Sequence, residues 1–318
     1  MIDGGDELVT VFGGGGFIGR YVCEILLKSS HRVRVASRNP RSAYFIQPLG
    51  QVGQIGYVAA DITKPDSVAR AVDGAAAVVN LSGILKGGFQ AVHATGAGNI
   101  AEAAREAGVQ AFVHISAIGA DPESQADYGK TKSEGEAAVR AAFPSATIIR
   151  PSLVFGPEDQ LTNRLAGLAR LPFLPVIAAQ RRFQPVYVRD LAQAIAAAAL
   201  DPEQHGGKTY EIGGPHVMTM RELHSAILDA TGQTPELVDM PNFMAKALSW
   251  FGWFPGAPLT RDQWRMLQND NVASEGTPGL EAFGINPTPL GAVAHEWLGR
   301  FNKGGRFAGR RINLTATS

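Results

Sequence analysis

The sequence predicts an α/β fold in which a doubly wound parallel sheet is followed by a smaller, mostly helical C-terminal lobe. Strand-like and helix-like segments alternate through the first half of the chain. Consecutive glycines separate the first strand from the first helix. At 318 residues, of which 45% are hydrophobic and 18% charged, the chain can bury a large core and form about two domains.

The first strand and helix flank a glycine-rich turn. Residues 8–12 are short, apolar and β-branched, which predicts a buried strand, and an apolar-periodic helix follows the glycines. Gly13, Gly16 and Gly19 have the spacing G-x-x-G-x-x-G, a variant of the dinucleotide fingerprint. Gly13 would permit a tight turn, Gly16 would leave amides open to a pyrophosphate, and Gly19 would let the helix approach the sheet. The alternative is a purely structural turn.

The remaining elements follow in regular order. Short apolar runs predict strands at 32–36, 57–60, 76–81, 111–116, 146–150 and 209–212. Longer periodic runs predict helices at 65–72, 96–107, 128–142 and 189–200. We therefore expect a Rossmann-type domain, with the smaller lobe over the carboxyl edge of its sheet. The expected Rossmann domain spans 1–156 and about 184–213, and the lobe about 157–183 and 214–318.

Composition excludes several function classes. The formal net charge is zero, so nothing draws the chain as a whole to nucleic acid. The single cysteine, Cys23, has no partner for an internal disulfide. No stretch of 18 apolar residues occurs, so we expect no membrane-spanning helix. The seven histidines have no metal-ligand spacing, and we predict no metal.

The end of the second strand indicates which dinucleotide would bind. Ser37, Arg38 and Asn39 stand where an acidic residue would hold the ribose 2′-hydroxyl of NAD. Arg38 is instead suited to a 2′-phosphate, which favours NADPH (or NADP+) over NADH. The alternative is a solvated surface arginine.

Other strand ends supply further candidate cofactor contacts. Asp61 can accept a hydrogen bond from the adenine amino group, although it can also cap the next helix. Small residues after the fourth strand would let the backbone run along the cofactor. The candidates from the glycine turn and the third and fourth strand ends are Gly13, Gly15, Gly16, Phe17, Ile18, Gly19, Asp61, Ile62, Leu81, Ser82 and Gly83.

Three polar residues form a candidate catalytic set. Tyr128 and Lys132 lie one turn apart on one face of a predicted helix, and Ser116 ends the preceding strand. The Lys132 ammonium would stabilise a phenolate and lower the pKa of Tyr128, making it an acid or base toward a carbonyl. Lys132 would also hold the nicotinamide ribose, and Ser116 would orient a substrate oxygen.

Together these motifs identify a family. The glycine motif, Asp61 and the Ser-Tyr-Lys set resemble the extended or atypical branch of the short-chain dehydrogenase/reductase superfamily, over about residues 8–232. Residues 150–157 match the stretch that runs past the nicotinamide in this branch. The resemblance therefore implies that Pro151, Ser152 and Leu153 bind the cofactor.

Within that branch the chain is most similar to the NADPH-binding accessory subunit of respiratory complex I and its bacterial relatives. The similarity depends on residues 11–19, 37–38 and especially 258–272. It implies tightly held NADPH with a structural or sensing role, no established turnover, and complex I subunits as partners. The implied location is peripheral, on the cytoplasmic side of a bacterial inner membrane. The alternative is a free-standing NADP-dependent reductase, epimerase or dehydratase acting on a nucleotide-sugar or small carbonyl compound.

Basic and aromatic residues gather in three stretches of the second half. Residues 164–189 contain five arginines and no acid. Residues 244–254 are rich in aromatics, and the tail after Glu296 is basic. This combination suits peripheral contact with anionic lipid headgroups or a membrane-embedded partner. The alternative is that the aromatics pack in the core of the smaller lobe.

Overall fold

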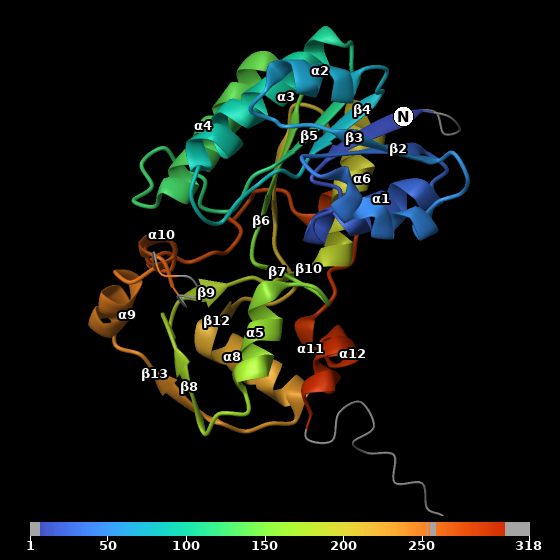
Figure 1. The fold of residues 1–318 in the computed structure, drawn as a ribbon. Helices are drawn as coiled ribbons and strands as arrows, with labels where there is room; N and C mark the ends of the chain where they lie inside the picture. Colours follow the sequence, from blue (N-terminus) through green and yellow to red (C-terminus); the bar gives the residue numbers. More distant parts are fainter. Residues whose placement is uncertain (1–6, 253, 255–258, 303–318) are drawn as a thin grey trace, which may run out of the picture.

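The computed structural model describes residues 7–252, 254 and 259–302, and these residues form an α/β fold (Figure 1). Within them, seven parallel strands make one sheet in the order β11-β6-β5-β4-β1-β2-β3. The strands are β1 Leu8–Phe12, β2 Arg32–Ser37, β3 Ile55–Ala59, β4 Ala77–Asn80, β5 Ala111–Ile115, β6 Thr147–Pro151 and β11 Thr209–Ile212. The predicted doubly wound parallel sheet is confirmed, and no strand end differs from the predicted one by more than two residues.

Helices cover both faces of the sheet (Figure 1). One face carries α1 (Phe17–Lys28) and α6 (Val188–Leu200), and the other carries α2 (Pro65–Val72), α3 (Gly96–Glu106) and α4 (Asp127–Ala142). Side chains alternate along each strand, so the sheet supplies both cores. Val9 and Val11 join the cluster under α1 and α6, whereas Phe12 joins the cluster under α2, α3 and α4.

Two helical segments were not predicted from the sequence. The 3₁₀ segment η1 (Pro40–Leu49) follows β2, and the π-helical segment η2 (Gln90–Thr95) runs directly into α3. Neither has the long apolar periodicity of a surface helix, which explains why pattern reading missed them. Both lie beside the expected nucleotide site, as described below.

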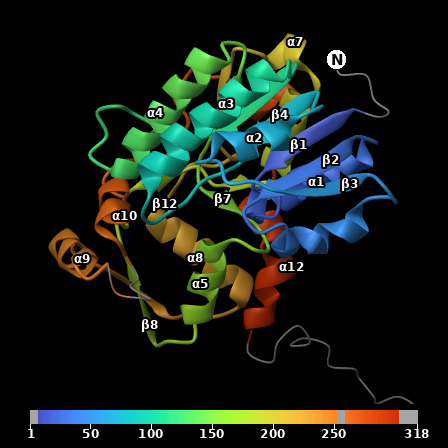
Figure 2. The same ribbon diagram turned by 45° about the horizontal axis from the view of Figure 1, so that its top comes forward.

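Most of the remaining described chain lies beneath the sheet in Figure 1, and it stays below the sheet in Figure 2, where the top of the molecule is turned forward. Its helices are α5 (Gln160–Leu168), α8 (Met220–Thr231), α9 (Asn242–Ser249), α10 (Arg261–Met266), α11 (Leu290–Val293) and α12 (His295–Leu298), and η4 (Gly299–Phe301) is a 3₁₀ turn. The 3₁₀ turn η3 (Leu280–Phe283) packs instead on α6, beside the sheet. Short strands pair as β8 (Phe173–Val176) with β13 (Glu236–Asp239), β9 (Arg182–Phe183) with β12 (Met218–Thr219), and β7 (Val154–Phe155) with β10 (Val186–Tyr187). The sequence did not predict these pairs, because each strand has only two to four residues and Pro175 interrupts β8.

These elements contact the carboxyl edge of the sheet. Asn271 bonds to the loops that follow β5 and β6, and Gln184 bonds to Gly214 after β11. We propose the lobe boundaries that the sequence predicts, with 157–183 and 214 onward as the smaller lobe. No helix among the described residues is both long and apolar enough to cross a membrane.

Candidate nucleotide-binding site

The turn between β1 and α1 requires glycine at its first and last positions. Gly13 has φ +78°, a left-handed conformation, and its amide donates to the carbonyl of Ala36 at 3.1 Å. A Cβ on Gly19 would lie 2.6 Å from the Cα of Gly14 and closer still to the carbonyl oxygen of Gly13. The helix can therefore begin against the strand only with glycine at position 19, as the sequence predicts.

The turn presents an open helix N-terminus. Gly16 is the exposed N-cap of α1, no side chain caps the helix, and no acidic residue lies in its first turn. The amides of the first turn have no intrahelical acceptor, and the helix dipole adds partial positive charge there. This arrangement fits a phosphate group. Phe17 and Ile18 anchor the turn by packing against the core.

The segment η1 encloses the turn from one side. A Cβ on Gly15 would lie 2.9 Å from the Cβ of Ala43, so η1 packs directly on the glycine backbone. The guanidinium of Arg20 lies over the Phe45 ring at 4.6 Å from its centroid. The requirement for glycine at position 15 thus comes from packing by a segment that the sequence did not reveal.

Arg38 and Asp61 lie close enough at the ends of β2 and β3 for their charges to interact. Arg38 is exposed and has no ion pair or hydrogen bond among the described residues. The pKa of Asp61 lies below its ordinary value because the Thr63 hydroxyl and amide donate to it, and Lys64 and Arg38 add a smaller effect. Asp61 therefore orders the turn before α2. The alternative that it caps this helix is wrong, because the N-cap is Lys64 and no side chain caps α2.

Ser37, beside Arg38, has a buried hydroxyl with no hydrogen-bond partner in the described part of the chain. A hydroxyl and a guanidinium at one strand end are the donors that a ribose phosphate requires. Sequence reasoning noted Ser37 only as part of the non-acidic strand end, and the unpaired hydroxyl is what now marks it.

The backbone after β4 crosses in front of the glycine turn. The Leu81 amide donates to the Phe12 carbonyl, and a Cβ on Gly13 would lie 3.2 Å from the Leu81 carbonyl carbon. Asn80 accepts from the Ser82 amide at 3.0 Å, which fixes this loop. Gly83 is exposed, and a Cβ there would lie 3.6 Å from the Lys132 Nζ. Ile62 differs, since it packs on the start of α3.

The three candidate catalytic residues meet at the ends of β5 and α4. Lys132 is buried and donates from Nζ to the Ile115 carbonyl at 2.9 Å, and Nζ lies 5.9 Å from the Tyr128 ring centroid. Ser116, the next residue after Ile115, is buried with its hydroxyl unpaired among the described residues. The spacing of these residues in the sequence therefore does bring them together.

The structure corrects the expected pKa of the tyrosine. Burial raises the pKa of Tyr128 to about 12, and no opposing effect of Lys132 offsets it. Burial also lowers the pKa of Lys132 to about 8, against the opposite effect of Glu136, which pairs with Arg150 instead. In this arrangement the phenol is neutral at pH 7, and the expected depressed tyrosine pKa is wrong.

His93 belongs to the site although sequence reasoning treated every histidine as a surface or packing residue. Its Nε2 accepts from the Ile84 amide at 3.1 Å and its Nδ1 lies 3.1 Å from the Thr131 hydroxyl. The Thr131 hydroxyl donates its proton to the backbone carbonyl of Asp127, so it accepts from His93. The His93 proton is therefore on Nδ1. Burial lowers the pKa of His93 to about 3, with a further effect from Lys132, so the ring stays neutral. His93 joins the loop after β4 to α4.

Pro151, Ser152 and Leu153, which are predicted to lie beside the nicotinamide, each make hydrogen bonds within the protein. Pro151 accepts from the Ile118 amide, and Leu153 accepts from the Val186 amide. The hydroxyl of Ser152 is 2.8 Å from both the backbone and side-chain oxygens of Asn271, so the residue is engaged within the protein. The resemblance identified the segment that contains Asn271 but assigned it no contact.

These residues fit a nicotinamide dinucleotide laid along the carboxyl edge of the sheet. The glycine turn and helix N-terminus suit the pyrophosphate, and Arg38 with the unpaired Ser37 hydroxyl suits a 2′-phosphate. The Lys132 ammonium and the unpaired Ser116 hydroxyl lie where the nicotinamide end would reach. A bound dinucleotide would supply a hydride donor or acceptor there.

The pKa of Lys132 predicts how nucleotide affinity depends on pH. We expect affinity for NADPH to fall as the pH rises through about 8, because Lys132 then loses the proton with which it would bind the ribose.

The stability of the nucleotide-free protein should change in the opposite direction over this pH range. The Lys132 pKa is below its ordinary value of 10.5, so the free energy of unfolding should rise between about pH 8 and 10.5. Calorimetry and denaturation across this range, with Lys132→Met as control, measure both; a pH-independent affinity would contradict the assignment.

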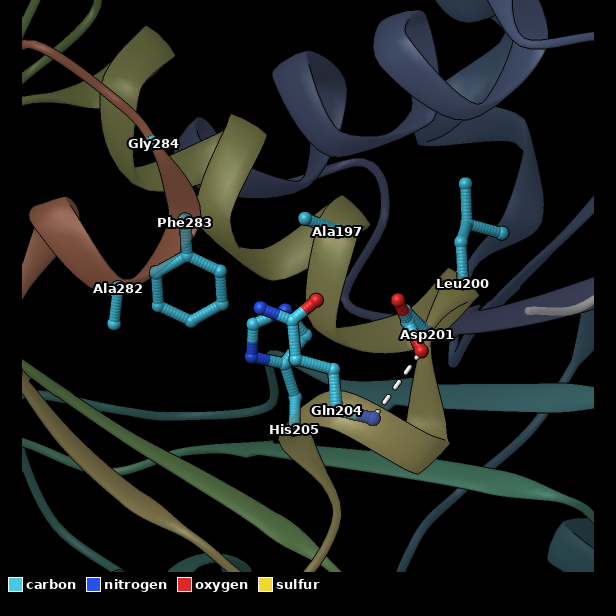
Figure 3. A pocket seen from close by; sticks show the side chains of 8 residues that line it. All are labelled: Ala197, Leu200, Asp201, Gln204, His205, Ala282, Phe283 and Gly284. Carbon is cyan, nitrogen blue, oxygen red and sulfur yellow. Dashed lines mark hydrogen bonds between the residues drawn. The ribbon is translucent and has the colours of Figure 1, made fainter.

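A separate hollow, drawn in Figure 3, lies near the amino edge of the sheet, where α7 precedes β11. It is lined by α6, α7 (Pro202–His205) and η3, including His205, Phe283 and Asp201. The His205 ring stacks on Phe283 and bonds to the Tyr210 hydroxyl at 2.9 Å, while Asp201 caps α7. These contacts are structural. Across the described ranges, no His, Cys, Asp or Glu cluster suited to a metal ion occurs.

The aromatic stretch of the smaller lobe is on the surface. Trp250 is 59% exposed, Phe251 65% and Phe254 59%, so the alternative that these described aromatics form a core is wrong. The guanidinium of Arg261 lies over the Trp250 ring at 4.6 Å from its centroid. Trp253 and the basic tail from 303 onward lie outside the described residues.

Comparison with known proteins agrees with this geometry. Residues 13–168 match the NAD(P)H-binding family model. The chain is 33% identical over 305 residues to subunit 9 of the NADH dehydrogenase [ubiquinone] 1 alpha subcomplex of Rattus norvegicus, covering 92% of this chain and 80% of that protein. The chain belongs to the family of that subunit. This chain thus combines membership of the subunit 9 family with an NAD(P)H-binding domain, in agreement with the expected short-chain dehydrogenase/reductase relationship.

Other similar proteins are reductases. The chain is 34% identical over 200 residues to the ceramide reductase of Caulobacter vibrioides, covering 61% of this chain and 62% of that protein. A solved NADPH-dependent quinone oxidoreductase of Escherichia coli, in complex with NADPH, superposes with a TM-score of 0.72 at 20% identity, covering 91% of this chain and 99% of that one. The structural likeness confirms the fold.

Proposed function

We propose that this protein is an NADPH-holding accessory subunit of respiratory complex I. In this role the nucleotide is held as a structural element or a sensor, and the partners are other complex I subunits. The observation that carries the proposal is the extent of the likeness to subunit 9, which spans 92% of this chain, whereas the likeness to ceramide reductase spans 61%. A nucleotide-binding domain alone would not require similarity through the smaller lobe.

The choice of NADPH over NADH rests on the end of β2. The unpaired, exposed Arg38 and the unpaired hydroxyl of Ser37 favour a 2′-phosphate, and among the described residues no acid stands at that strand end to hold a free 2′-hydroxyl. The glycine turn does not distinguish NADPH from NADH, because it would contact only the pyrophosphate, which both nucleotides share.

The proposed location is the cytoplasmic side of a bacterial inner membrane, with peripheral contact to anionic lipid headgroups. Exposed Phe243, Trp250 and Phe251 lie on and just after α9, and Lys246 and Arg261 lie next to them. Aromatic side chains among basic ones suit the interface of an anionic bilayer. The same aromatic and basic surface would also suit contact with a membrane-embedded partner subunit.

Purification from native membranes tests the proposal. A resident subunit is expected to comigrate with complex I on native gels and to retain NADPH through gel filtration, as measured by the absorbance and fluorescence of the released nucleotide. Migration apart from complex I, with NADPH exchanged within seconds and a sugar nucleotide turned over, would contradict it.

A free-standing NADP-dependent reductase, epimerase or dehydratase is the second candidate, favoured by the meeting of Ser116, Tyr128 and Lys132. On this function, Tyr128→Phe should reduce carbonyl reduction or epimerisation by at least about 100-fold, because the mechanism uses the phenol as the acid toward the substrate oxygen. Folding and nucleotide retention should persist, since the Tyr128 hydroxyl has no hydrogen bond among the described residues. Steady-state assays and thermal denaturation check both expectations, and full activity in the variant would exclude this mechanism.

A further inference from the structure

Helix α4, which carries Tyr128 and Lys132, does not cap its own N-terminus. Its N-cap is Ala126, whose side chain has no hydrogen-bonding group, and no side-chain cap bond is made there. The first amides of a helix need acceptors from elsewhere. At the start of α4 these acceptors come from the smaller lobe.

Asp262 supplies both acceptors from α10. One carboxylate oxygen accepts from the Asp127 amide at 2.6 Å and the other from the Tyr128 amide at 3.1 Å. The position of Asp262 is itself fixed, because Thr260 and Gln263 form a reciprocal capping box around the first turn of α10. A carboxylate at a helix N-terminus also interacts favourably with the helix dipole.

Nine residues after Asp262, the same segment makes a second attachment through Asn271. The Asn271 side-chain amide donates to the Ile118 carbonyl after β5 at 3.1 Å, and Asn271 oxygens accept from the Ser152 hydroxyl after β6. Asp270 pairs with Arg182 at 2.8 Å, which holds this part of the segment on the smaller lobe. Residues 260–272 therefore fix three parts of the site edge: the start of α4 and the loops after β5 and β6.

We propose that Asp262 is a positioning residue, which holds Tyr128 and Lys132 at the nicotinamide end of the site and slows nucleotide release. Asn271 acts with it on the two neighbouring loops. The inference rests on the proposed NADPH-holding function and deepens it, since it assigns retention to the smaller lobe as well as to the glycine turn. On this inference, residues 260–272 support the site by fixing the start of α4 and the two loops, without contacting the nucleotide themselves.

A graded set of variants tests this role. Asp262→Ala removes both acceptors and should raise the NADPH release rate roughly two- to thirtyfold, the range that the loss of a helix cap spans. Asp262→Asn keeps one oxygen acceptor and should give an intermediate rate. Arg265→Ala, at an exposed side chain on the same helix, should leave release unchanged and serves as the matched control.

Two further measurements separate positioning from general stability. Release is followed by stopped-flow NADPH fluorescence, and exchange of the Asp127 and Tyr128 amides by NMR should be faster in Asp262→Ala, without nucleotide. The bound NADPH emission maximum should shift toward that of free nucleotide. If Asp262→Ala does not fold, Asp262→Asn and Asn271→Ala provide the same comparison.

The outcomes distinguish this inference from the proposed function. Faster amide exchange with unchanged release and emission would overturn the positioning role, because Asp262 would then be only a structural cap. Failure of the wild-type protein to retain NADPH would instead contradict the proposed function. A release rate that increases from wild type through Asp262→Asn to Asp262→Ala supports both the positioning role and the NADPH-holding function.

Discussion

Replacing Arg38 by aspartate is expected to weaken NADPH binding by roughly 10- to 150-fold, the equivalent of losing a charged hydrogen bond worth about 1.5–3 kcal/mol. The new carboxylate repels the 2′-phosphate and offers an acceptor to the free 2′-hydroxyl of NADH, so the preference should move toward NADH. Titration calorimetry with both nucleotides measures the change.

A matched control exists on the same strand. Arg32 is exposed at the opposite end of β2, so Arg32→Asp makes the same change in net charge away from the site. We expect that variant to bind NADPH like the wild-type protein at physiological salt, because exposed charges at that separation are screened. An unchanged NADPH preference in Arg38→Asp would show that Arg38 is only a surface residue.

Replacing Gly19 by alanine is expected to damage both the fold and the site. The added methyl group would overlap the backbone of Gly13 and Gly14, which cannot rotate away as a side chain can. Overpacking of this kind costs about 1–3 kcal/mol in the free energy of unfolding. Moving the turn to relieve the overlap also displaces the amides proposed to bind the pyrophosphate, so NADPH affinity should fall as well.

Gly56→Ala is the control for this substitution. Gly56 lies in β3, and a Cβ there would have no neighbour within 4 Å. Its replacement should leave the free energy of unfolding unchanged or slightly higher, because alanine has less conformational freedom in the unfolded chain. Urea denaturation of nucleotide-free protein compares the two variants. Equal stability of Gly19→Ala and the wild-type protein would mean that the helix does not need this close approach.

The sheet and its helices were predictable because their signals are local. Buried parallel strands appear as short apolar runs, and α1, α3 and α6 have clear periodicity or glycine boundaries. The clustering of Ser116, Tyr128 and Lys132 was predictable for the same reason. A strand end and one face of the following helix in a parallel sheet meet at the carboxyl edge.

The features that the sequence did not reveal depend on contacts between distant residues. His93 enters the site through a π-helical segment and is fixed by Ile84 and Thr131. The raised pKa of Tyr128 follows from burial, which cannot be predicted from the Y-x-x-x-K spacing. Asp262 caps a helix that begins 135 residues earlier in the chain, so no local pattern around either residue indicates the bond.

Calorimetry on well-folded protein stripped of nucleotide most directly tests whether this chain is built to hold a nicotinamide dinucleotide. The geometry of the glycine turn, Arg38 and Lys132 predicts saturable binding of NADPH, with weaker binding of NADH. Absence of measurable affinity for either dinucleotide would contradict the account at its foundation.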